Sequence, residues 1–289
     1  WVHEADETMP DMGLKVFFVD VVQGDGCLIE TEHNRILVDG GPNNHFKNYM
    51  TKWKCKWLLA AGHIVRFDAA FVRHFDADHF AGLISIIKDP RFEIGAVYHN
   101  GIARFHDEIK ERLVKYDTDL GRTNAHGKPN VDREVLKTSF SSIADAKKLL
   151  NESPGKKGLM YSFKRFLEAT VDAGDKGRLG KMKRLTVRDG HVPGFSGNEA
   201  LKLQILGPVP TRKNGPYQFQ WFKDSSHTRN GHSLILKLSF GQRSILLGGD
   251  LNTYSEKSLL GYYKQDNPFR VDAAKACHHG ASEFTVEFM

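Results

Sequence analysis

Residues 69–83 read AAFVRHFDADHFAGL, and no other stretch says more about the fold. Residues 69–73 are a short apolar run typical of a buried strand, and the apolar positions after the polar residues predict a helix over 80–88. Between them lie four side chains of the kinds that bind metal ions: His74, Asp76, Asp78 and His79. So many ligands at the end of a buried strand predict a metal site. A solvated surface loop is the alternative.

The spacing of these side chains indicates two ions. Residues i and i+2 of an extended loop point the same way, so His74 and Asp76 face one ion together. Asp78 and His79 stand at the start of the helix, where the helix dipole favours a carboxylate.

Two further candidate ligand groups come after predicted strands. Gly248-Gly249-Asp250 comes after a strand expected over 243–247, and its glycines let the backbone come close to bound cations. Alone, this pattern also fits an ordinary turn. His278-His279-Gly280 comes after a strand expected over 272–277. One of these two histidines can equally be a core residue or a residue that only hydrogen-bonds a metal ligand. The spacing leaves open which of the two binds the metal.

The rest of the chain predicts an α/β protein with two mixed sheets and helices outside them. Other strands are expected over 14–21, 26–31, 34–39, 96–99, 201–206 and 232–240, and other helices over 46–61, 102–116, 141–151, 161–172 and 253–263. The helix over 46–61 places Trp53 and Trp57 in the core at helical spacing. The charged, helical stretch 101–197 is interpreted as an insertion within one domain, 1–289.

Composition indicates an ordinary globular protein, with 40% hydrophobic and 26% charged residues. No apolar run approaches the roughly 20 residues that a membrane helix needs, and no signal peptide is visible. Cys27, Cys55 and Cys277 have no paired spacing. We interpret them as core thiols, which favours a reducing, cytoplasmic location.

Positive charge is concentrated in one segment of the chain. Residues 156–188 hold ten Lys or Arg against three Asp or Glu, while the whole chain carries a net charge of +6. This favours nucleic acid as an anionic partner, with a solvated surface as the alternative, and Lys181, Lys183 and Arg184 are the candidate substrate contacts. The nearby aromatic residues stack bases or belong to the core: Tyr161, Phe163, Phe166, Tyr217, Phe219, Trp221 and Phe222.

Taken in order, six motifs resemble the metallo-β-lactamase superfamily and, within it, the hydrolase domain of ComEC-type DNA-uptake proteins. The motifs are FFVDVVQGDGCLIET, ILVDGG, RHFDADHFAGL, LQILGP, NGHSLILKLSFGQRSILLGGDL and KACHHGAS. The resemblance implies an αββα sandwich with a two-metal site on one edge. That family usually continues beyond the position of Gly280, which implies a further domain or partner subunit.

The resemblance also implies a ligand set. Asp39 matches a structural aspartate that supports the metal loop, Asp250 matches a bridging carboxylate, and His278 or His279 matches the last ligand. Asp76 replaces a histidine of the family motif, and His232 falls near another. One ion is then expected on His74, Asp76 and His232, and the other on Asp78, His79 and His279. The two divalent ions are expected to be zinc or manganese, since Asp76 makes the first site more anionic.

The implied activity is metal-dependent hydrolysis by a hydroxide that bridges the ions, with Asp76, Asp78 and His278 in catalytic roles. A phosphodiesterase or nuclease acting on DNA or RNA is the favoured interpretation. The alternatives are a phosphodiesterase for a small headgroup or cyclic nucleotide, a lactamase or lactonase, and a metal-binding sensor module of a larger assembly.

Overall fold

The structure is a computed structural model that describes residues 13–105, 135–137, 140–152, 158–197, 200–210 and 218–288. Most of the helix predicted over 102–116 lies outside these residues, as does Tyr217. Within them, no helix combines the length and the apolar character needed to cross a membrane.

Six strands form the first sheet, in the order β1-β2-β3-β4-β5-β7. Their bounds are Lys15–Phe18, Gly26–Glu30, Arg35–Asp39, Val65–Val72, Phe92–His99 and Leu179–Arg184. The first three strands, which confirm those predicted over 14–21, 26–31 and 34–39, are antiparallel neighbours, and β3, β4, β5 and β7 run parallel. The carboxyl ends of β3 and β4 therefore meet at one edge of the sheet.

Four strands form the second sheet, in the order β12-β11-β10-β8. Their bounds, in chain order from β8, are Leu201–Gly207, Ile235–Phe240, Arg243–Leu247 and Ala273–Lys275. Strand β10 is antiparallel to β8 and β11, whereas β12 is parallel to β11. A short pair, β6 (Val135–Lys137) with β9 (Gln218–Gln220), lies apart from both sheets.

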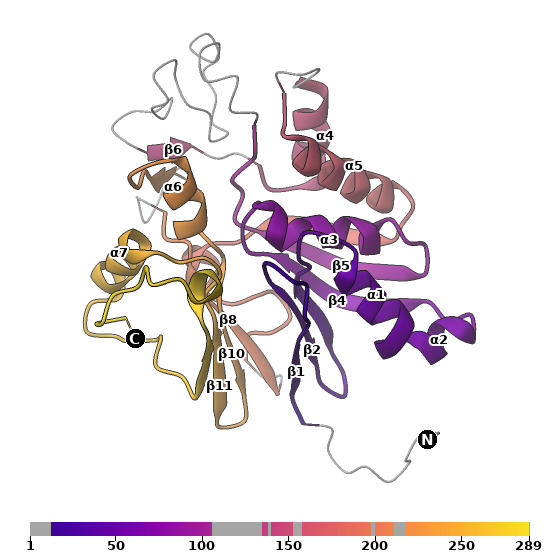
Figure 1. Cartoon of the computed structure of the whole chain (residues 1–289), viewed down its shortest axis with the longest axis horizontal. Helices are drawn as coiled ribbons and strands as arrows, with labels where there is room; N and C mark the ends of the chain where they lie inside the picture. The colour runs from indigo at the N-terminus through magenta and orange to yellow at the C-terminus, as the bar shows by residue number, and fades with distance from the viewer. Residues whose placement is uncertain are drawn as a thin grey trace.

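Helices cover the outer faces of both sheets (Figure 1). The first sheet carries α1 (His45–Tyr49), η1 (Met50–Lys54), α2 (Lys56–Ala60), α3 (Ala77–Ile87), α4 (Ile143–Glu152) and α5 (Tyr161–Asp175). Helix α7 (Thr253–Tyr263) covers the second sheet. The short elements α6 (Ser225–Gly231), η4 (Val187–Asp189) and η5 (Cys277–Gly280) complete the described structure. This order of layers is the αββα sandwich expected from the resemblance.

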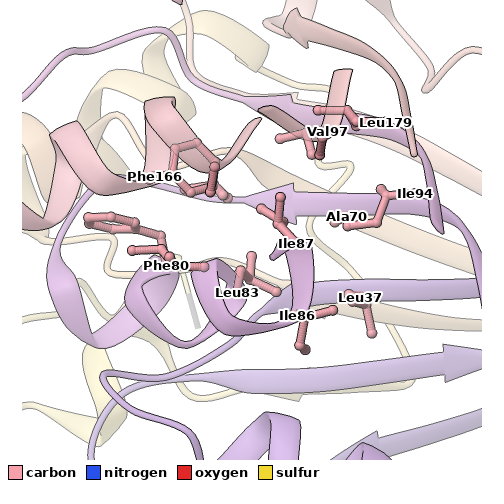
Figure 2. Packing of buried hydrophobic residues seen from close by; sticks show 14 of the residues in the cluster. Leu37, Ala70, Phe80, Leu83, Ile86, Ile87, Ile94, Val97, Phe166 and Leu179 are labelled. Carbon is pink, nitrogen blue, oxygen red and sulfur yellow. The ribbon is translucent and has the colours of Figure 1, made fainter. Parts of the chain in front are cut away.

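Alternating side chains of β4 build two of the cores, because successive residues of a strand point to opposite faces. Ala70 and Val72 pack among the helices, while Ala69 and Phe71 face the second sheet, where the Phe71 ring stacks on Tyr98 with centroids 5.3 Å apart. Figure 2 shows the helix-side core, with Leu83 and Ile87 of α3 and Phe166 of α5 against the sheet. A smaller apolar cluster lies between the second sheet and α7.

The range 101–197 contributes to this main body. Strand β7 is the edge strand of the first sheet, and Phe163 and Phe166 of α5 belong to the same core as α3. The described second half of 101–197 therefore packs into the sandwich, and the interpretation of this range as an insertion within the domain stays a prediction. Charged residues of α4 and α5, among them Lys148, Lys164 and Glu168, lie on the exposed sides of these helices.

The prediction that Trp53 and Trp57 lie in the core is wrong, since they are 76% and 77% exposed. The segment contains a π-turn, in which the amide of Cys55 donates to the carbonyl of Met50 at 2.8 Å. The buried positions are Phe46, Met50 and Cys55, at spacings of four and then five. The extra residue rotates the rest of the helical segment by about 100°, so both tryptophans face solvent.

The predicted core thiols are confirmed for Cys27 and Cys55, which are buried, while Cys277 is half-buried. All three cysteines are free.

Candidate metal centre

Loops from both sheets meet at one edge of the sandwich and carry the candidate ligands. His74 comes after β4, and Asp78 and His79 lie in the first turn of α3. Asp250 comes after β11, and His279 lies in η5, just after β12. The site therefore joins two parts of the chain that are far apart in sequence.

Four side chains form the centre of the cluster: Asp78, His79, Asp250 and His279. One ligand atom from each lies within 4.8 Å of the others. Nε2 of His79 is 3.1 Å from Oδ1 of Asp250, and Nε2 of His279 is 3.4 Å from Oδ2 of Asp250 and 3.3 Å from Oδ2 of Asp78. These are four of the residues predicted as ligands.

Two more histidines lie beside Asp250. Nε2 of His74, which is fully buried, is 3.7 Å from Oδ2 of Asp250, and Nε2 of the half-buried His278 is 4.0 Å from the same oxygen. Of the adjacent pair, His279 is the one in contact with both Asp78 and Asp250. Both residues of the pair have positive φ, +46° and +55°, a backbone conformation that costs a non-glycine residue about 1 kcal/mol or more and occurs at functional sites.

The donor atoms fit a divalent cation. Nε2 of His74, Nε2 of His79 and Oδ1 of Asp250 are buried and make no well-oriented hydrogen bond among the described residues, although His79 Nε2 and Asp250 Oδ1 lie 3.1 Å apart. Buried polar atoms without well-oriented partners are costly, and a bound cation would satisfy them. Imidazole nitrogens and carboxylate oxygens together suit zinc and also manganese.

Outer contacts orient each imidazole so that Nε2 points into the cluster. Oδ2 of Asp39 lies 2.7 Å from Nδ1 of His79, and Oδ1 of Asp25 lies 3.2 Å from Nδ1 of His279. The hydroxyl of Ser233 lies 3.2 Å from Nδ1 of His74. A carboxylate on the far nitrogen of a metal-binding histidine fixes the tautomer and raises the basicity of the ligand.

Arg73 ties the two supporting carboxylates together. Its Nε donates to Asp39 Oδ2 at 2.7 Å, its backbone amide donates to Asp39 Oδ1 at 2.9 Å, and its Nη2 pairs with Asp25. Lys275 Nζ lies 2.6 Å from the other oxygen of Asp25. Burial works to raise the pKa of both carboxyls, but Arg73 and the neighbouring cations hold each pKa below its usual range. Both groups are therefore ionised supports.

The cluster favours positive charge. Hydrogen bonds with Asp25, Asp250 and Asp78 raise the pKa of His279 to about 11. Burial works to lower the pKa of His79, but Asp39 and Asp250 raise it to about 9. Burial and the neighbouring His79 instead lower the pKa of His74 to about 4, so His74 is a neutral donor. A divalent ion placed among these carboxylates would supply the charge that the site attracts.

Glycines permit two of the close approaches. Gly24 has φ +88°, and a Cβ there would lie 1.9 Å from the carbonyl oxygen of Asp78, so only glycine lets the Asp25 loop reach α3. Gly249 has φ +66°, and a Cβ there would lie 2.7 Å from Cβ of Ser233. It brings Asp250 against the His74 loop.

Two predicted ligands lie outside the cluster. Asp76 pairs with Arg104 and lies 3.5 Å from Nε of Arg229. Nε2 of His232 lies 2.7 Å from the carbonyl oxygen of Gln220, and its ring packs against Phe219 and Phe222. The expected set of His74, Asp76 and His232 is thus not brought together. With Asp76 bound to guanidinium groups, the sequence argument that favoured manganese loses its geometric basis.

The predicted substrate contacts are placed on β7. Lys181 is exposed, with Nζ 5.9 Å from the centroid of the Tyr98 ring. Lys183 Nζ is 2.8 Å from Oδ1 of Asp189, and Arg184 contacts the carbonyl oxygen of Phe140. Within the basic segment, several cationic groups are paired with carboxylates, among them Lys164, Lys176, Arg178 and Lys183.

Sequence reasoning did not single out Asp25, Arg73, Ser233, Arg104 or Arg229. Arg73 carried a usable signal, because an arginine at the end of an apolar strand needs buried carboxylate partners. Asp25 stands in the turn Gly24-Asp25-Gly26, where its role could not be distinguished from turn formation.

No family model matches this sequence, and no curated protein matches it. Solved structures match at low similarity. The hydrolase AbOPH in the beta lactamase superfamily has 14% identity and a TM-score of 0.35, with 78% of this chain and 55% of that chain covered. AidC, a dizinc quorum-quenching lactonase, has 16% identity and a TM-score of 0.31, with the same two coverages.

A third match is Tm1679, a metal-dependent hydrolase of the beta-lactamase superfamily, with 11% identity and a TM-score of 0.35. The matched region covers 89% of this chain and 70% of that chain. The present chain thus spans 55% of the length of the first two matched structures. At identities and TM-scores this low, the function of the chain rests on the chemistry of its own site.

Proposed function

We propose that this chain is a metal-dependent hydrolase of the metallo-β-lactamase superfamily that cleaves phosphodiesters. One observation carries the proposal: buried nitrogen and oxygen atoms of His74, His79 and Asp250, which make no well-oriented hydrogen bond among the described residues, lie in a cluster of imidazoles and carboxylates. Membership of the ComEC-like branch is proposed only from the resemblance of motifs such as RHFDADHFAGL and KACHHGAS.

Two divalent ions are proposed. Asp78, His79, Asp250 and His279 would hold one, and His74, whose Nε2 lies 3.7 Å from Oδ2 of Asp250, would contribute to the other. Bound divalent ions would supply an activated water nucleophile and would polarise the scissile phosphoryl oxygen. Asp25 and Asp39 hold His279 and His79 in the orientation that this requires.

His278 is proposed to act on the substrate directly. It is half-buried, its Nε2 lies 4.0 Å from Oδ2 of Asp250, and its Nδ1 lies 3.9 Å from Oε2 of Glu283 without a hydrogen bond among the described residues. An imidazole in this position can hydrogen-bond the substrate or donate a proton to the leaving oxygen. His279, held by Asp25, Asp78 and Asp250, is not free to do so.

The arginines around Asp76 support an anionic substrate. Arg104 and Arg229 both contact Asp76, which lies between His74 and Asp78 in the sequence. Guanidinium groups bind phosphate oxygens in the planar, two-pronged manner that suits a diester. A neutral lactam or lactone offers them no such partner.

Nucleic acid is the proposed diester, recognised through its phosphates. The aromatic residues considered for base stacking give little support, because Phe163, Phe166, Phe219 and Phe222 are buried. Their burial favours a small phosphodiester as the second candidate. Both candidates share the same metal chemistry, and chain length of the substrate separates them.

A cleavage assay with measured metal content tests the proposal. The protein is loaded with zinc or manganese and incubated with single-stranded DNA, duplex DNA, RNA and bis(p-nitrophenyl) phosphate. We expect metal-dependent cleavage that the Asp78→Asn, Asp250→Asn double variant loses by at least about 100-fold. The exposed pair Asp175→Asn, Asp266→Asn, with the same change in charge, is the control and should keep full activity.

Each contrary outcome is specific. Cleavage of the small diester without any nucleic acid would replace the nucleic-acid substrate by a small one. A protein that carries its ions and cuts no diester contradicts the substrate class and leaves the metal site standing. A protein that binds no divalent ion contradicts the whole proposal.

A further inference from the structure

A second feature of the surface is unrelated to the metal centre. Trp53, Trp57, Leu58 and Ile64, here called the tryptophan surface, are 76%, 77%, 41% and 59% exposed. They lie in η1, in α2 and in the turn that leads to β4. Single exposed apolar residues are common, but four large ones within twelve residues mark an interaction surface.

The charged side chains of the chain segment that carries these residues are all positive. Between Asp39 and Asp68 the chain has five Lys or Arg and no Asp or Glu. Lys47 and Lys54 pair with Asp89 and Glu30, which neutralises those carboxylates. Lys52 and Lys56, which flank the tryptophans, are exposed and form no ion pair within the described part of the chain. The net charge that this face offers is therefore cationic.

The tryptophan surface lies far from the metal centre. Ile64 immediately precedes β4 and His74 lies two residues beyond its end, so the eight residues of β4, at about 3.3 Å each, put roughly 25 Å between them. Figure 1 shows α2 at the right-hand end of the molecule, away from α6 and α7. Residues at this distance do not contact the reacting group at the metal centre.

We infer that the tryptophan surface docks the protein on an anionic lipid bilayer. Tryptophan prefers the level of the lipid headgroups, aliphatic side chains enter the acyl boundary, and lysine stems reach back to anionic headgroups. Leu58 and Ile64 distinguish this surface from a base-stacking platform, because aliphatic side chains gain nothing from stacked bases. The surface also sits on short helices at one end of the molecule, where a flat bilayer can reach it.

Vesicle binding tests the inference. The protein is mixed with phosphatidylcholine vesicles with and without phosphatidylglycerol, and the bound fraction is measured by flotation. We expect at least about tenfold stronger binding to the anionic vesicles, weakened by salt. Trp53→Ala, Trp57→Ala and, separately, Lys52→Glu, Lys56→Glu should each reduce binding by about tenfold or more.

Matched controls separate this face from general charge and aromaticity. Lys148→Glu, Lys164→Glu on α4 and α5 makes the same change in net charge, and Tyr161→Ala removes another exposed ring, 69% exposed. Both should bind vesicles as the unaltered protein does. Circular dichroism and unfolding midpoints check that all variants are folded.

Three results would overturn the inference. The first is equal binding of the unaltered protein and the tryptophan variant to anionic vesicles. The second is binding of a single-stranded oligonucleotide, but not of vesicles, that depends on Trp53 and Trp57. The third is a concentration-dependent dimer, seen by light scattering, that the tryptophan variant abolishes.

Discussion

Two buried carboxylates hold the far nitrogens of two cluster histidines, Asp39 for His79 and Asp25 for His279. Arg73 neutralises both, so each can stay ionised in the core. The geometry of the cluster thus depends on residues that touch no ion. Removing one of these supports should weaken metal binding while the ligands themselves remain.

Asp25→Asn is expected to weaken metal binding by about 10–100-fold, because an amide holds the imidazole of His279 less firmly and lowers its basicity. A titration against a chromophoric chelator gives the affinity directly. Asp272→Asn, which alters a half-exposed carboxylate paired with Arg243, is the control. Unchanged affinity in Asp25→Asn would show that the contact with His279 is incidental.

His99 gives a prediction for stability against pH. It is fully buried, its Nδ1 accepts from the amide of Gly101 at 3.0 Å, and burial lowers its pKa to about 3 from an ordinary value near 6.5. Between these two pH values the unfolded chain holds a proton that the folded protein does not. The free energy of unfolding should therefore fall as pH falls through this window, by about 1.4 kcal/mol per unit for one proton.

Replacing His99 by glutamine removes the group that binds this proton in the unfolded chain. Urea unfolding at neutral pH and near pH 5 should show His99→Gln destabilised at neutral pH, with a difference from the parent protein that shrinks by about 2 kcal/mol on acidification. The other buried histidines contribute equally to the pH dependence of both proteins, so their contribution cancels in this comparison. The exposed His33→Gln change should leave the pH dependence as it was. A constant difference would mean that His99 is protonated in the folded state.

At the scale of elements, α5 packs its apolar side into the core of the first sheet. Phe166 is fully buried, and its ring lies edge-on to Phe75 and Phe80, with centroids 5.4 Å and 5.6 Å away. Phe75 lies in the metal-binding loop and Phe80 in α3. Packing of α5 therefore supports the loop that carries His74.

Phe166→Ala is expected to lower the free energy of unfolding by about 3–5 kcal/mol, from lost apolar burial and the cavity that remains. Chemical denaturation with a single transition should report it. Tyr161→Ala, on the exposed side of the same helix, should change stability by less than about 0.5 kcal/mol. If the Phe166 variant instead showed a separate early transition, 101–197 would be an independent unit.

At the scale of the molecule, the metal centre joins the two sheets. Asp78 and His79 come from the first sheet and its helix, whereas Asp250 and His279 come from the second. An ion bound to all four contacts both halves of the sandwich and binds only the folded state. Metal should therefore stabilise the whole protein rather than one loop.

Zinc or manganese at about 100 times its dissociation constant should add about 2.7 kcal/mol to the free energy of unfolding. Thermal unfolding with metal and with a chelator measures this shift. Asp250→Asn should show little shift, since it removes the carboxylate shared by both halves. A full shift in that variant would place the ion elsewhere.

Local sequence patterns were enough to predict the layers and most residues of the histidine and aspartate cluster. Periodicity located both sheets, and strong donor residues at strand ends pointed to His74, Asp78, His79, Asp250 and the His278-His279 pair. These features depend on neighbours within a few residues. The same local reasoning failed at Trp53 and Trp57, because a π-turn changes the helical phase without a recognisable signal in the residues.

Which side chains meet depends instead on the tertiary structure. It brought Asp25 to His279 across more than 250 positions, turned Asp76 toward Arg104 and Arg229, and packed His232 between Phe219 and Phe222. The physical reason is that side-chain direction at a loop depends on the partners that close over it, and those partners come from distant strands.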